Sequence, residues 1–80
     1  MLKYSLVRRV HHKEGTQEEV LFTSGNAEAV KSAMFEEIAK WCLKNQSEAF
    51  EVAYKSSTAI AFFVDNGALV VFETTLEIED

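Results

Sequence analysis

The chain has no proline, one cysteine, three glycines and no long apolar run. The single cysteine, Cys42, excludes an internal disulfide framework and fits a reducing compartment, so we expect a cytoplasmic protein. No run approaches the roughly 18 apolar residues of a membrane span, and no continuous apolar segment opens the chain. We therefore expect neither a membrane partner nor a signal peptide. The glycines are isolated from one another, which excludes a glycine-rich phosphate loop.

Basic residues are also few, with 8 Lys and Arg against 13 Asp and Glu and a net charge of −5. This balance argues against nucleic acid as a partner, because lysine and arginine supply most of the affinity for phosphates. The basic residues are unevenly spread, and no acidic residue lies among the four that open the chain: Lys3, Arg8, Arg9 and Lys13. No Lys or Arg follows Lys55, whereas five acidic residues do. Either the two ends pair across a sheet, or the four basic residues form a charged partner surface.

Apolar residues make up 48% of the chain, so it should fold as one domain over residues 1–80. Alternation of apolar and polar residues predicts five strands, over 3–11, 18–23, 50–55, 58–64 and 68–75. Apolar residues spaced about 3.6 apart predict one helix, from Ala27 to Lys44 or Asn45. The element order β-β-α-β-β-β predicts an α+β domain, an antiparallel sheet with one helix packed on one face. A domain of this size buries only about 60–65% of its unfolded surface, and oligomerisation is a common remedy for that marginal stability.

Several local features refine this fold. Asn26 is a good N-cap residue, and alternation slips between Leu6 and Val7, which a β-bulge would explain. With Glu14-Gly15 as a turn pair, Arg9 would lie opposite Val20. Strand orders 2-1-5-4-3 and 1-2-3-4-5 both remain open, and charge segregation favours the first, because it places the basic first strand beside the acidic fifth. The apolar arc expected on the helix contains Ala27, Val30, Met34, Phe35, Ile38, Trp41 and Cys42.

The segment from Phe50 to Phe72 is apolar on two faces. A two-residue turn at Asn66-Gly67 would pair Phe62 with Val71. That register places Val52, Phe63, Val70 and Phe72 under the helix. It leaves an apolar outer face with charged margins, made of Ile60, Phe62, Val64, Leu69 and Val71. One helix covers one face of a sheet, so we expect this second face to be an interface.

Signals for chemistry are weak. His11 and His12 are adjacent on a strand and should point to opposite faces, and His11 with Glu18 opposite it would supply two metal ligands at best. Cys42 lies inside the apolar arc of the helix, where core packing explains it. We therefore expect no cofactor, no metal site and no enzyme.

Three functions remain as hypotheses. The first is a noncatalytic protein-binding module that forms a homodimer through its second apolar sheet face. The alternative is a small acidic inhibitor or adaptor, of the phage or mobile-element type, that binds a host protein. The third is an enzyme or metal site that uses His11, His12 and Glu18.

Overall fold

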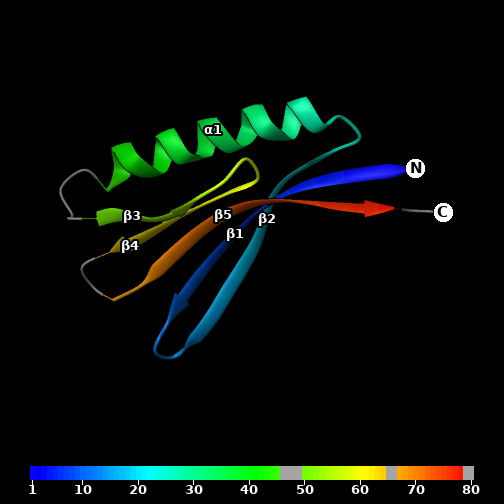
Figure 1. Ribbon diagram of the computed structural model, residues 1–80. Coiled ribbons are helices and arrows are strands. Elements are labelled where there is room, and N and C mark those ends of the chain that lie inside the picture. Colours follow the sequence, from blue (N-terminus) through cyan, green and yellow to red (C-terminus); the bar gives the residue numbers. More distant parts are fainter. Residues whose placement is uncertain (46–49, 65–66, 79–80) are drawn as a thin grey trace.

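The protein folds as one antiparallel sheet with a helix packed on one face (Figure 1). The computed structural model describes residues 1–45, 50–64 and 67–78. The elements in chain order are β1 Leu2–His12, β2 Gly15–Ser24, α1 Ala27–Lys44, β3 Phe50–Lys55, β4 Ala59–Val64 and β5 Leu69–Ile78. The predicted α+β class and the order β-β-α-β-β-β are confirmed. Both chain ends lie at the same end of the molecule, on the neighbouring strands β1 and β5 (Figure 1).

The strands are ordered β2-β1-β5-β4-β3, which is the order that charge segregation favoured. β1 therefore lies between β2 and β5. Arg9 on β1 donates from Nε to Glu18 of β2 at 2.9 Å and from Nη1 to Glu73 of β5 at 2.7 Å. The basic start of the chain thus pairs with the acidic end across the sheet, as opposite charges on neighbouring strands tend to do.

The first hairpin contains the expected irregularity. Leu6 pairs with Phe22 and Val7 with Val20, so β2 carries Leu21 as an extra residue between the two pairs. Leu6 and Val7 point to opposite faces of the sheet, and both are buried.

The turn of this hairpin was predicted wrongly. It lies at 13–14 instead of Glu14-Gly15, because Gly15 pairs with His12 and has a φ of +136°. Arg9 accordingly pairs with Glu18 and not with Val20. Between the turn and the bulge this shift is an even number of residues, so the side chains of that stretch keep their predicted faces.

The helix begins and ends where the sequence predicts. The Oδ1 atom of Asn26 accepts hydrogen bonds from the backbone N–H groups of Glu28 at 2.9 Å and Ala29 at 3.4 Å, which caps α1. Val30 and Met34 are buried against the sheet. Phe35, however, is 60% exposed. It lies about 100° around the helix from Met34, so the arc that contacts the sheet is narrower than predicted.

The second hairpin differs from its prediction by one residue. Phe62 pairs with Val70, and Phe63 pairs with Leu69. The backbone N–H of Val64 donates to the carbonyl oxygen of Ala68 at 3.0 Å, so three residues separate this pair where a two-residue turn was expected. Gly67, one of the three, has a φ of +88°. Residues 65–66, which include part of the predicted turn, lie outside the described residues.

A shift of one residue turns a whole strand over relative to its partner. Phe62 and Val64 therefore lie in the core beneath α1, and Ile60 packs at its edge. The prediction that these three residues form the outer face is wrong. The indole of Trp41 stacks on the ring of Phe62, with centroids 4.8 Å apart.

The β5 residues keep their predicted faces. Val70 and Phe72 are buried under the helix, and Leu69 and Val71 lie on the opposite side. Val52 shares the helix face, but it is exposed at the edge strand β3.

Candidate functional site

The sheet face opposite α1, here called the outer face, is not covered by any element of the described chain. Alternation of side chains along the paired strands decides its membership. It contains Ser5, Val7 and Arg9 of β1, Glu18 and Val20 of β2, Glu51 and Tyr54 of β3, Ala59, Ala61 and Phe63 of β4, and Leu69, Val71 and Glu73 of β5. The outer face is thus apolar at its centre and charged at its margins, by Glu51 on the β3 side and by Arg9, Glu18 and Glu73 on the other, which matches the anatomy of protein interfaces.

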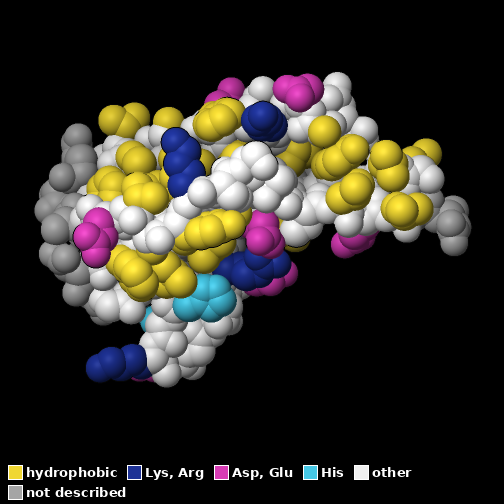
Figure 2. Space-filling model, viewed as in Figure 1, with side chains coloured by type: hydrophobic (Ala, Val, Ile, Leu, Met, Phe, Trp, Pro, Cys, Tyr) yellow, Lys and Arg dark blue, Asp and Glu magenta, His cyan; other side chains and the backbone are white. Residues whose placement is uncertain are grey.

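The outer face has pronounced relief. Ala59 and Ala61 are almost inaccessible, whereas the ring of Phe63 next to them is 51% exposed. Leu69 and Val71 on the neighbouring strand are partly exposed. A projecting ring therefore lies beside a floor of small side chains. In the view of Figure 2, hydrophobic side chains gather over the region of β4 and β5, with charged side chains of both signs beside them.

The arginine of the outer face is paired within the molecule. The guanidinium of Arg9 bridges Glu18 and Glu73, at 2.9 and 2.7 Å. Its hydrogen bond to Glu73, followed by that to Glu18, raises the pKa of Arg9 above its already high ordinary value. Because the guanidinium retains carboxylate partners, a covering surface would not leave it buried and unpaired, which is the costly case.

The interface predicted from sequence is therefore corrected in part. Leu69 and Val71 are on the outer face as expected, but Ile60, Phe62 and Val64 belong to the helix side. The residues that the sequence interpretation missed are their neighbours on β4, above all Phe63. The strict alternation of β4 marks them as one set, but only the register of the hairpin shows which face that set occupies.

The four basic residues at the start of the chain do not form one surface. Arg8 and Arg9 point to opposite faces, and Arg8 pairs with Glu19 of β2 at 2.5 Å. Lys3 lies opposite Glu77, and Lys13 is exposed in the first turn. A single charged partner surface made of Lys3, Arg8, Arg9 and Lys13 is therefore not formed, and Arg8 and Arg9 pair with carboxylates on opposite faces of the sheet.

The histidines do not converge with Glu18. His11 pairs with Thr16, and its Nδ1 lies 2.9 Å from the Thr16 Oγ1. Glu18 is held by Arg9 instead. Within the described ranges 1–45, 50–64 and 67–78, no three His, Cys, Asp or Glu side chains lie close enough to hold a metal ion. Cys42 is a free thiol packed at the edge of the core.

A second group of exposed apolar side chains lies where the two chain ends meet, past the N-terminal end of α1 (Figures 1 and 2). Leu2 pairs with Ile78, and Leu76 lies on the same side of the sheet. These strand ends are exposed because the helix does not extend over them. No helix in the described part of the chain is long and apolar enough to cross a membrane.

Comparison with protein-family models, with curated proteins and with solved structures gives no match to this chain.

Proposed function

We propose that the protein is a noncatalytic, cytoplasmic protein-binding module that forms a homodimer through the outer face of its sheet. The observation that carries this proposal is an uncovered sheet face that is apolar at its centre and whose arginine is already paired with two carboxylates. Apolar patches of this kind on small soluble domains mark association sites. The single free cysteine fits a reducing compartment.

A second copy is the occupant that best fits the relief of this surface. In a two-fold dimer the same patch is used by both partners, so each projection needs a recess on the same surface. Phe63 supplies a projecting ring, and Ala59 and Ala61 supply a low floor beside it. Two such faces can pack about 10 Å apart, with the ring of each copy over the alanines of the other.

The size of the molecule is compatible with this arrangement. A standard interface buries about 800 Å² on each partner. That is about a seventh of the 5532 Å² that one copy exposes. Dimerisation would also supplement a core that is small because the chain has 80 residues.

The test is to place a charge on the outer face at Phe63. Phe63→Lys should leave the core intact and convert a dimer to a monomer, because an unpaired ammonium would be buried at the contact. Phe35→Lys is the matched control, since Phe35 is a similarly exposed phenylalanine, at 60%, that lies on α1. Molar mass measured by light scattering, with circular dichroism as the check of folding, distinguishes the two variants.

Two outcomes would contradict the proposal. A wild-type protein that is monomeric at about 100 μM would exclude a dimer of useful affinity and leave the small acidic inhibitor or adaptor as the better hypothesis. Equal loss of dimer in Phe63→Lys and Phe35→Lys would mean that the contact does not involve the outer face.

A further inference from the structure

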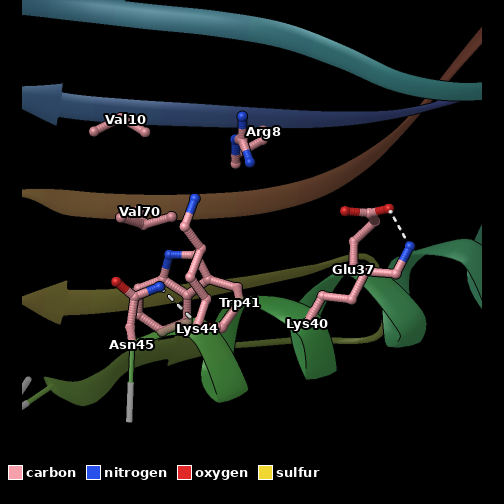
Figure 3. A pocket seen from close by; sticks show the side chains of 8 residues that line it. All are labelled: Arg8, Val10, Glu37, Lys40, Trp41, Lys44, Asn45 and Val70. Atoms are coloured by element: carbon pink, nitrogen blue, oxygen red, sulfur yellow. Dashed lines mark hydrogen bonds and ion pairs between the residues drawn. The ribbon is translucent and has the colours of Figure 1, made fainter. Parts of the chain in front are cut away.

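On the opposite side of the sheet, an open groove of about 450 Å³ lies between α1 and β1 (Figure 3). Val10 of β1 and Val70 of β5 form its floor, and Trp41 of α1 forms its wall. Arg8 projects from β1 at one side, Lys44 approaches from the helix, and Lys40 extends along the helix toward Glu37. The groove therefore combines an apolar bottom with a basic rim, and its volume is in the range of small-ligand sites.

The wall of the groove is held in place from behind. One face of the Trp41 indole stacks on Phe62, and its edge meets Phe50 at a centroid distance of 4.9 Å. These contacts fix the ring, so no ordering of the ring is required when a ligand binds. The indole Nε1–H of Trp41 has no acceptor among the described residues and is not sealed in the core. A ligand with an acceptor atom would satisfy this donor.

Carboxylates limit how much negative charge the rim can take. Glu19 pairs with Arg8 at 2.5 Å, and Glu37 approaches the Nζ of Lys40 at 3.5 Å. Lys44 forms no ion pair with any described residue. In Figure 3 its side chain extends across Trp41 toward the floor. The rim thus offers one ammonium without a carboxylate partner in the part of the chain that the structure describes, together with two cations that are already partly neutralised.

We propose that this groove binds a carboxylate carried on an apolar group. The carboxylate would pair with Lys44 and accept from the Trp41 indole, and the apolar group would lie on Val10 and Val70. Glu37 in the rim and Glu19 on Arg8 disfavour a polyanion, because they neutralise part of the positive charge. Such a carboxylate can belong to a free organic acid or to the last residue of a peptide.

Trp41 is the only tryptophan of the chain, so it reports on the groove directly. Phenylacetate titrated into the full chain should shift the indole N–H resonance of Trp41 in a saturable manner, with a dissociation constant in the millimolar range. Its neutral analogue 2-phenylethanol should bind more weakly. A peptide that ends in a free phenylalanine, compared with its amidated form, distinguishes the sources. Tighter binding of the peptide assigns a chain terminus, and tighter binding of phenylacetate assigns a free acid.

Lys44→Gln provides the decisive variant, with Lys31→Gln as the matched control. Both lysines are exposed on α1, but Lys31 lies away from the groove. Removing the Lys44 charge should weaken phenylacetate binding about two- to fivefold, the range of a solvent-exposed ion pair, and Lys31→Gln should leave it unchanged. The proposal is overturned if neither phenylacetate nor the peptide with a free C-terminal phenylalanine shifts the Trp41 resonance. It is also overturned if 2-phenylethanol binds as tightly as phenylacetate, or if Lys44→Gln and Lys31→Gln bind phenylacetate with the same affinity.

Discussion

Adjacent phenylalanines on β4 should differ sharply in their contribution to stability. Phe62 is 3% exposed and contacts the rings of Trp41, Phe50 and Phe72. Its replacement by alanine removes a fully buried ring and should cost about 3–5 kcal/mol. Phe63 is half exposed, so Phe63→Ala should cost about 1 kcal/mol in the monomer. Small domains have a total stability of only about 5–15 kcal/mol, so the first change approaches global unfolding.

Urea denaturation followed by Trp41 fluorescence measures both variants. Phe62→Leu, expected to cost about 1–2 kcal/mol, keeps the comparison measurable if Phe62→Ala does not fold. The experiment should be run at two protein concentrations about a hundredfold apart, because loss of a dimer contact depends on concentration and loss of core packing does not. The reasoning is refuted if Phe63→Ala costs as much as Phe62→Ala at both concentrations, since the β4 register would then be the opposite one.

Three further changes test individual contacts. Asn26→Ala should cost about 1 kcal/mol by removing the acceptor that caps α1, whereas Asn26→Ser should be nearly neutral in thermal denaturation. Gly67→Ala should cost about 1 kcal/mol because φ is +88° there. Gly25→Ala should cost less, since φ is not positive at Gly25 and the added Cβ would meet only the Leu2 carbonyl oxygen at 3.7 Å. Arg9→Gln should destabilise the fold by about 1 kcal/mol, because Glu18 and Glu73 lose their cationic partner. That difference from wild type should shrink in 1 M salt, because salt screens the ion pairs in the wild-type protein. A salt-independent loss would contradict an ionic role.

The parts of the fold that could be predicted from sequence depend on local capping and spacing patterns or on the distribution of charged residues. The ends of α1 follow from the capping side chain of Asn26 and from the helical spacing of apolar residues. The neighbouring positions of β1 and β5 follow from a basic strand and an acidic strand, and Arg9 with Glu73 supplies the contact. Neither inference required knowledge of how any hairpin is registered.

The register of the second hairpin was not predictable in the same way. Gly67 with positive φ suits both a two-residue turn and a three-residue loop. Alternation normally decides between them, but β4 reads Ala-Ile-Ala-Phe-Phe-Val and is apolar on both faces. Either Phe62 or Phe63 could have faced the helix on that evidence. The groove was missed for a different reason. Arg8 and Trp41 are far apart in sequence, and they meet only because α1 crosses the sheet beside β1.

The two proposed surfaces should act independently, because the sheet separates them. Arg8 borders the groove, and its neighbour Arg9 lies on the outer face. Changes at sites that share no contacts are usually additive. The Phe63→Lys variant should therefore bind phenylacetate with the affinity of the wild type. The Lys44→Gln variant should have the same molar mass in solution as the wild-type dimer. The double variant should show both defects at the size seen in each single variant. A change of more than about threefold in phenylacetate affinity on loss of the dimer would instead reveal coupling through β1, since both arginines lie on that strand.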